Sequence, residues 1–168
     1  MPATSYIGLG SNLAGRLRSP EEQIVTAVSE LNSLEDTLVT ATSSLYRSTP
    51  MTFDNSDSQP DYVNAVAVLL TGLEPDALLY QLHLIEQAHG RQRTSQWGPR
   101  TLDLDILLYD DLEMESVSLT IPHPGLCARE FVVYPMLEIT SDLEIPGHGK
   151  LSDIAASVPL NGLEKIEA

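Results

Sequence analysis

Two carboxylates two residues apart are the feature of this sequence that best indicates chemistry. Asp103 and Asp105 lie in the segment 101–109, where aliphatic residues alternate with other residues as in a β-strand. Side chains two residues apart on a strand share one face, so both carboxylates point the same way, with Cα atoms roughly 6.6 Å apart. Oxygen ligands at this spacing suit one ion or a pair of ions, and they favour Mg²⁺ or Mn²⁺ over zinc.

The simplest alternative is that the two aspartates only decorate the solvent side of a strand. Aspartate is depleted in strands, however, and two like charges on one face repel, so the pair lowers stability unless a cation offsets it. The opposite face is predicted to pack in the core, and it carries Leu102, Leu104, Ile106 and Leu108.

Basic residues gather just before this strand. Arg91, Arg93 and Arg100 fall in a ten-residue window without an acid, although the whole chain has 24 acids, nine basic residues and a net charge of −15. Guanidinium groups pair well with phosphate oxygens. The arginines and the aspartates together indicate a site for a metal-bound polyphosphate, and pairing of the arginines with surface acids is the alternative.

Composition limits the class of protein. The 168 residues suffice for one full core, and we expect a single domain over 1–168. The strong negative charge argues against binding to nucleic acid or to an anionic membrane. No apolar run approaches ~20 residues and the first residues lack signal-peptide features, so we expect a cytoplasmic protein. We also expect a monomer.

The expected elements follow the order βαββαβ. Strands are predicted at 6–10, 38–47, 61–71 and 101–109, and helices at 20–34 and 75–89. Ser19 and Pro20 suit the start of the first helix, and Gly90 suits the end of the second. This order predicts an α+β fold of the ferredoxin-like type, with both helices on one face of an antiparallel sheet. A C-terminal hairpin strand near 117–121 and a short helical extension within 127–137 are expected to follow.

Motifs along nearly the whole chain resemble those of the 6-hydroxymethyl-7,8-dihydropterin pyrophosphokinase family. They are YIGLGSNL at 6–13, YRSTP at 46–50, QPDYVN at 59–64, GRQR at 90–93, WGPRTLDLDI at 97–106, IPH at 121–123 and REF at 129–131. The resemblance implies a ferredoxin-like enzyme of folate biosynthesis. Such an enzyme moves the pyrophosphoryl group of ATP onto a pterin hydroxymethyl group and releases AMP.

The resemblance also implies roles for individual residues. The catalytic residues would be Arg91, Arg100, Asp103 and Asp105, and the two aspartates would hold two Mg²⁺ ions. ATP would be bound by Glu86, Arg91, Arg93, Trp97, Arg100, Ile106, His123 and Arg129. The pterin would be bound by Ser48, Thr49, Met51, Tyr62, Asn64, Trp97, Asp105 and Phe131, with its ring between the two aromatic side chains Trp97 and Phe131. Ser118 stands where some members of the family have an arginine.

Two other functions are compatible with the aspartate pair. Asp103 could be the nucleophile of a Mg²⁺-dependent phosphohydrolase, although Leu107 stands where such enzymes usually have a threonine. A covalent aspartyl-phosphate would support that function. The chain could also be a non-catalytic small-ligand module, because one fold serves many functions. Ligand binding without a metal requirement would support the module.

Overall fold

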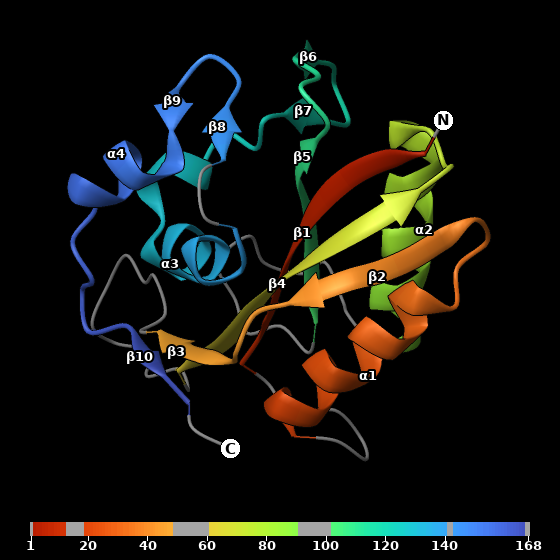
Figure 1. Cartoon of the computed structure of the whole chain (residues 1–168). Coiled ribbons are helices and arrows are strands. Elements are labelled where there is room, and N and C mark those ends of the chain that lie inside the picture. Colours follow the sequence, from red (N-terminus) through yellow and green to blue (C-terminus); the bar gives the residue numbers. More distant parts are fainter. Residues whose placement is uncertain (1, 13–18, 49–60, 91–101, 141–142, 167–168) are drawn as a thin grey trace.

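An antiparallel sheet forms the centre of the molecule (Figure 1). The computed structural model describes residues 2–12, 19–48, 61–90, 102–140 and 143–166. The first part of the chain forms β1 (Ala3–Ser11), α1 (Pro20–Asn32), β2 (Thr37–Thr42), β3 (Tyr46–Ser48), β4 (Tyr62–Thr71), α2 (Pro75–Ala88) and β5 (Asp103–Tyr109). The second part forms β6 (Met114–Glu115), β7 (Thr120–Ile121), a 3₁₀ turn (Leu126–Ala128), α3 (Glu130–Ile139), β8 (Glu144–Ile145), β9 (Gly149–Lys150), α4 (Leu151–Ala156) and β10 (Glu164–Lys165).

The strand order of the sheet confirms the predicted ferredoxin-like core. The order is β10, β3, β4, β1, β5, and β2 also pairs with β4. Every pairing in this sheet is antiparallel. The first and third predicted strands, β1 and β4, therefore lie in the centre, and the aspartate strand β5 lies at an edge.

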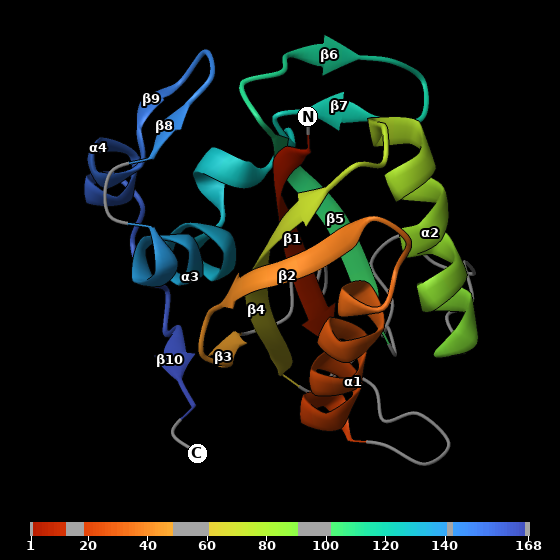
Figure 2. The ribbon, with the colours of Figure 1, turned by 45° about the vertical axis from the view of Figure 1, so that its right-hand side comes forward.

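Helices cover both faces of the sheet (Figure 2). On one face α1 and α2 pack in a large cluster with side chains such as Ile7 of β1 and Leu104 of β5. On the other face α3 and α4 pack in a second cluster, which includes Val66 of β4. The two predicted helices thus share one face, as expected. The opposite face is covered by α3, and the candidate site described below lies on that face.

The predicted start of α1 and end of α2 are confirmed. The Ser19 hydroxyl accepts the N–H of Glu22, whose carboxylate in turn accepts the N–H of Ser19, and Pro20 is the first helical residue. After α2, Gly90 has φ +83°, a backbone angle that favours glycine.

The prediction of one continuous strand at 38–47 is wrong. The segment forms β2 and β3, which pair with different parts of β4. Between them the Ser43 hydroxyl, instead of a backbone carbonyl, accepts the N–H of Val66. The backbone N–H of Ser44 donates to Glu138 of α3. Side chains of Ser43 and Glu138 therefore supply part of the hydrogen bonding at this corner, beside the backbone bond from the Ser43 N–H to the Val66 carbonyl.

The predicted alternation along 101–109 holds as far as Leu107, which packs in the cluster on the α3 face. The pairing with β1 shifts by one residue, so Ile7 pairs with Ile106 and Tyr6 pairs with Leu108, which leaves Leu107 as the extra residue. Leu108 consequently packs in the cluster on the α3 face. Tyr109 packs against the cluster on the α1 and α2 face, the reverse of the prediction.

The C-terminal part extends this core beyond what was predicted. The expected hairpin is β6 paired with β7, and the expected short helix is α3. The hairpin of β8 and β9, the helix α4 and the strand β10, which pairs with β3, were not predicted. Within the described residues, no helix has the length and apolarity needed to cross a membrane.

A buried polar cluster ties the end of α2 to α1. His89, which ends α2, and Gln23 of α1 are both buried. The imidazole contacts the Gln23 amide oxygen through Nδ1, and its Nε2 lies 2.5 Å from the Glu30 carboxylate. The cluster therefore fixes the helix end that directly precedes the arginine-containing segment 91–100.

We predict that His89→Ala lowers the free energy of unfolding by about 1–3 kcal/mol, because it leaves a buried amide and a carboxylate without their partner. Urea denaturation monitored by circular dichroism measures this change. Gln87→Ala, at an exposed position of the same helix, is the matched control and should change stability by less than about 0.5 kcal/mol. Equal midpoints for the two variants would contradict the prediction.

Candidate active site

Strand pairing places the two aspartates on one face of the sheet. Asp105 of β5 pairs with Gly8 of β1, and Asp103 pairs with Gly10. On its other side Gly10 pairs with Asn64 of β4. Directly paired residues share a face, so Asn64, Gly10 and Asp103 form a row across three strands.

Gly8 and Gly10, which we call the glycine floor, lie on the face that α3 covers. Val66, the β4 partner of Gly8, packs in the α3 cluster. A Cβ at Gly10 would lie 3.2 Å from Asn64 Oδ1, whereas a Cβ at Gly8 would make an ordinary 3.4 Å contact with Leu107. Glycine at position 10 thus lets the Asn64 amide lie close to β1, and neither glycine places a side chain of its own between this amide and the two carboxylates.

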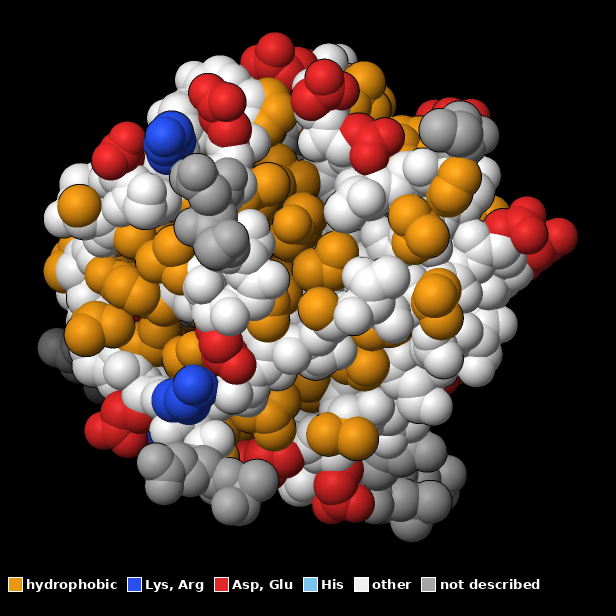
Figure 3. Space-filling view, in the orientation of Figure 1, with side chains coloured by type: hydrophobic (Ala, Val, Ile, Leu, Met, Phe, Trp, Pro, Cys, Tyr) orange, Lys and Arg blue, Asp and Glu red, His pale blue; other side chains and the backbone are white. Residues whose placement is uncertain are grey.

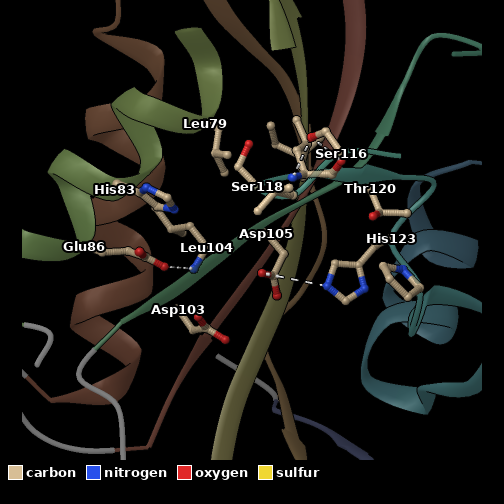
Figure 4. Close-up of a pocket in the computed structure, with 14 residues that line it drawn as sticks. Leu79, His83, Glu86, Asp103, Leu104, Asp105, Ser116, Ser118, Thr120 and His123 are labelled. Atoms are coloured by element: carbon tan, nitrogen blue, oxygen red, sulfur yellow. Dashed lines mark hydrogen bonds and ion pairs between the residues drawn. The ribbon is translucent and has the colours of Figure 1, made fainter. Parts of the chain in front are cut away.

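A pocket of about 290 Å³ opens beside β5 (Figure 4). Its lining comes from α2, from β5 and from the segment after β5: Leu79, His83, Glu86, Asp103, Leu104, Asp105, Ile106, Ser116, Val117, Ser118, Leu119, Thr120, His123 and Pro124. Because β5 is an edge strand, side chains from both faces of the sheet reach this pocket. It brings together five of the predicted site residues: Glu86, Asp103, Asp105, Ile106 and His123.

The α2 wall of the pocket was only partly predicted. Glu86 is buried, and its carboxylate accepts the backbone N–H of Leu104 at 2.8 Å, between the two aspartates. Leu79 and His83, which the sequence analysis did not single out, share this wall. Their spacing of four and three residues puts them on the same side of a helix as Glu86, so periodicity alone could have found them.

His123 faces Asp105 across the pocket, as Figure 4 shows. Its Nε2 lies 3.9 Å from Asp105 Oδ1, and its Nδ1 accepts the N–H of Gly125 at 3.0 Å. Its own backbone N–H donates to the carbonyl of Leu107, the extra residue of β5. The shift in strand register therefore provides the carbonyl that anchors His123.

The protonation state of His123 follows from its surroundings. Burial, and next the positive charge of Arg129, lower its pKa from 6.5 to about 4, although Asp103 acts in the opposite direction. The ring is thus neutral near pH 7. Because Nδ1 accepts a hydrogen bond, the proton lies on Nε2, which is the nitrogen that faces Asp105.

Arg129 and Phe131 lie at the start of α3. The Arg129 guanidinium carbon lies 5.8 Å from the centre of the Phe131 ring, within the range of a cation–π contact. The same guanidinium lies against Gly125, where a Cβ would come within 2.5 Å of Arg129 Nε. Because Gly125 has no side chain, the Arg129 guanidinium can lie beside the Phe131 ring.

Three predicted pterin-binding residues lie on the strands beyond the glycine floor. Asn64 and Ser48 are buried, and the Asn64 amide donates to the Ser48 hydroxyl at 2.7 Å. Tyr62 pairs with Ser48 across β3 and β4 and, as predicted, shares a face with Asn64. This hydrogen bond orients the amide, so that its oxygen lies toward Gly10.

The remaining predicted site residues lie outside the described part of the chain. They are Thr49, Met51, Arg91, Arg93, Trp97 and Arg100.

The carboxylate pair fits Mg²⁺. Mg²⁺ in phosphate-transferring enzymes is bound by one or two carboxylates together with phosphate oxygens and water, and Asp103 and Asp105 provide such a pair. Among the described residues, no group of three His, Cys, Asp or Glu side chains is placed to hold a metal ion.

Acidic side chains dominate the charged groups on the face shown in Figure 3, consistent with the net charge of −15.

Comparison with known proteins identifies similar sequences along most of the chain. Residues 6–141 match the model of the 7,8-dihydro-6-hydroxymethylpterin-pyrophosphokinase family. The chain is 45% identical over 151 residues to the 2-amino-4-hydroxy-6-hydroxymethyldihydropteridine pyrophosphokinase of Haemophilus influenzae, covering 90% of each chain. It is 42% identical over 161 residues to the protein of the same name from Pseudomonas aeruginosa, covering 96% of this chain and 95% of that one.

Solved structures show the same fold. The wild-type HPPK-DHPS of Plasmodium falciparum, crystallised with pteroate, superposes with a TM-score of 0.73 at 12% sequence identity. The match covers 93% of this chain and 44% of that chain, so this chain spans less than half of the longer protein. At this identity the likeness supports the fold alone.

Proposed function

This chain belongs to the 7,8-dihydro-6-hydroxymethylpterin-pyrophosphokinase family and transfers the pyrophosphoryl group of ATP to the hydroxymethyl group of 6-hydroxymethyl-7,8-dihydropterin in folate synthesis, and we propose that the transfer takes place above the glycine floor. The observation that carries this proposal is the row of Asn64, Gly10 and Asp103 across three strands. The row joins a group suited to reading a heterocycle with a group suited to holding a metal ion. The two substrates would therefore meet over Gly10.

On the β5 side, Asp103 and Asp105 would hold two Mg²⁺ ions and through them the phosphates of ATP. When bound, these ions would neutralise phosphate charge and lower the pKa of a coordinated hydroxyl. His123 would donate a hydrogen bond from Nε2 to a phosphate oxygen, and Arg129 would add a positive charge. Glu86 and Ile106 would shape the wall that receives the rest of the nucleotide. Arg91, Arg93 and Arg100 are proposed to clamp the triphosphate.

On the β4 side, Asn64 would bind the edge of the pterin ring. Its amide offers an acceptor oxygen and a donor that the pterin edge can use, and its bond to Ser48 keeps it in place. Phe131 from α3 would cover one face of the ring and Trp97 the other. Tyr62, Thr49 and Met51 would complete this half of the site.

The reaction would be an in-line attack of the pterin hydroxyl oxygen on the β-phosphorus of ATP, with AMP as the leaving group. Positioning and charge stabilisation supply most of the acceleration in such transfers. Asp105, nearer the centre of the sheet than Asp103, would accept the hydroxyl proton or ease its departure. The neutral His123 would act as a hydrogen-bond donor at neutral pH, because its pKa of about 4 keeps it uncharged there.

The direct test is incubation with ATP, Mg²⁺ and 6-hydroxymethyl-7,8-dihydropterin, with products separated by chromatography. We expect AMP and the pterin diphosphate, and no product in the presence of a chelator. Asp103→Asn and Asp105→Asn should each lower kcat by at least about 100-fold, because each removes a metal ligand but keeps the side-chain shape. Asp111→Asn, at an exposed turn after β5, is the control.

ADP or inorganic phosphate as the main product would contradict the proposed transfer and favour a phosphohydrolase. Pyrophosphoryl transfer that persists in the presence of chelator would contradict the proposed requirement for a metal ion. A near-normal rate in either aspartate variant would contradict that residue's role.

We predict that Gly10→Ala lowers kcat/KM for the pterin by about 10-fold, because its Cβ crowds the Asn64 amide and fills the space over the floor. Gly8→Ala is the matched control on the same strand, and it should remain within about threefold of the parent, since its Cβ makes only an ordinary contact with Leu107. Steady-state kinetics with the pterin as varied substrate measures both. Equal effects of the two substitutions would contradict the account of the floor.

We also propose that residues 1–168 act as one domain and as a monomer in the cytoplasm, where ATP is available. The helices α1, α2 and α3 all pack on a single sheet, which supports one domain. Sedimentation velocity of the purified chain should show one species of monomer mass, and a dimer at micromolar concentration would contradict the monomer.

A further inference from the structure

A carboxylate near the end of α3 accepts several hydrogen bonds from residues at the corner between β2 and β3. Glu138 accepts the backbone N–H of Ser44 at 3.0 and 3.1 Å through its two oxygens, and the Ser44 hydroxyl at 2.8 Å. It also accepts the phenol of Tyr46 at 2.6 Å. Lys165 of β10 lies 3.9 Å away. The function proposed above does not use this group.

The Glu138 carboxylate is charged and the Tyr46 phenol is neutral near pH 7. Burial alone would raise the pKa of Glu138, but the hydrogen bonds from Tyr46 and Ser44 and the charge of Lys165 hold it below its ordinary value. Burial, the hydrogen bond to Glu138 and its negative charge raise the pKa of Tyr46. A charged acceptor with three donors is a strong connection between a helix and a sheet.

This connection acts on the strand pair that carries the proposed pterin contacts. Tyr46 of β3 pairs directly with Asn64 of β4. Two residues further along, the Ser48 hydroxyl of β3 accepts a hydrogen bond from the Asn64 amide. The phenol that Glu138 holds is therefore the cross-strand neighbour of the group proposed to bind the pterin edge.

The connection also acts on the aromatic side chain proposed to cover the pterin. Phe131 precedes Glu138 by seven residues, which is about two helical turns and about 10.5 Å along α3. At this spacing both side chains lie on the same side of the helix. The side of α3 that binds the β2–β3 corner is thus the side that presents Phe131.

We propose that Glu138 is a positioning residue for the pterin site, which sets the separation between Phe131 on α3 and Asn64 on the sheet. The inference rests on the proposed function, because it takes these two residues as the pterin contacts. Loss of the Glu138 connection widens this separation and weakens pterin binding. Of the proposed nucleotide contacts among the described residues, only Arg129 at the start of α3 belongs to the helix that Glu138 holds. The others lie on β5, on α2 and at His123, so ATP binding changes less than pterin binding.

The test is titration of 6-hydroxymethyl-7,8-dihydropterin into the full chain saturated with Mg²⁺ and a non-hydrolysable ATP analogue, followed by calorimetry. Glu138→Gln and Tyr46→Phe should raise the pterin Kd by about 5- to 20-fold, because the first removes the charge and one acceptor oxygen and the second removes the phenol that donates to the carboxylate. The Kd of the ATP analogue, measured separately, should change by less than about twofold. Tyr46→Phe also tests the proposal if Glu138→Gln does not fold.

Tyr134→Phe is the matched control. Tyr134 lies on the same helix, and its phenol donates to the carbonyls of Ala155 and Val158 at the α4 side instead of to the sheet. The Tyr134→Phe variant loses a phenol hydroxyl just as Tyr46→Phe does. It should therefore lower the free energy of unfolding to a similar extent and leave the pterin Kd unchanged. Lys165→Met should also leave the pterin Kd within about twofold, since an exposed ion pair contributes little.

Unchanged pterin affinity in Tyr46→Phe would overturn the positioning role, as would an equal loss in Tyr134→Phe. Asn64→Ala separates this failure from failure of the proposed function. If Asn64→Ala binds the pterin normally, the pterin site itself is wrong and the inference falls with it. If Asn64→Ala loses the pterin and Tyr46→Phe does not, only the role of Glu138 is overturned.

Discussion

The pairing of β1 with both β4 and β5 is the constraint on which the site depends. It places Gly10 directly between Asn64 and Asp103, and Gly8 directly beside Asp105. A side chain at Gly10 would crowd the Asn64 amide, and one at Gly8 would pack on Leu107. A sheet normally gains stability from cross-strand side-chain pairs, and this one gives up such pairs at Gly8 and Gly10, where we propose that the two substrates meet.

Hydrogen bonds from outside the regular ladder then hold the surrounding elements against this sheet. The Glu86 carboxylate binds the free edge of β5 at Leu104, and the backbone of His123 binds the same edge at Leu107. Glu138 joins α3 to the β2–β3 corner, and His89 joins α2 to α1. Each of these groups is costly to bury without a partner. Each therefore fixes its element in one place, which a site that must align two reactants requires.

Local signals in the sequence predicted the elements that depend on local chemistry. Ser19, Pro20 and Gly90 marked helix ends correctly, apolar and β-branched runs located most of the strands, and alternation located β5. The break at Ser43 and the register shift at Leu107 were not predicted, because each depends on a partner far along the chain: the Val66 N–H for the first and the pairing with Tyr6 and Ile7 for the second. The short strands after α3 have too few residues to show a period.

The same division applies to the site. The metal-bound polyphosphate at Asp103 and Asp105 was predicted from spacing and charge, and it stays a prediction. The pterin came from the resemblance of motifs, because no spacing rule identifies a heterocycle. The opposition of His123 and Asp105, the tautomer of His123 and the Glu138 connection needed the three-dimensional structure, since they join residues from separate elements.

The most direct test of the central claim is a crystal structure with Mg²⁺, a non-hydrolysable ATP analogue and 6-hydroxymethyl-7,8-dihydropterin. The account predicts Mg²⁺ within about 2.0–2.1 Å of carboxylate oxygens of both Asp103 and Asp105. It also predicts the pterin over Gly10, with its edge hydrogen-bonded to Asn64 and its hydroxymethyl group directed toward the β-phosphorus. Metal ions bound away from these two aspartates, or a pterin bound away from the glycine floor, would contradict it.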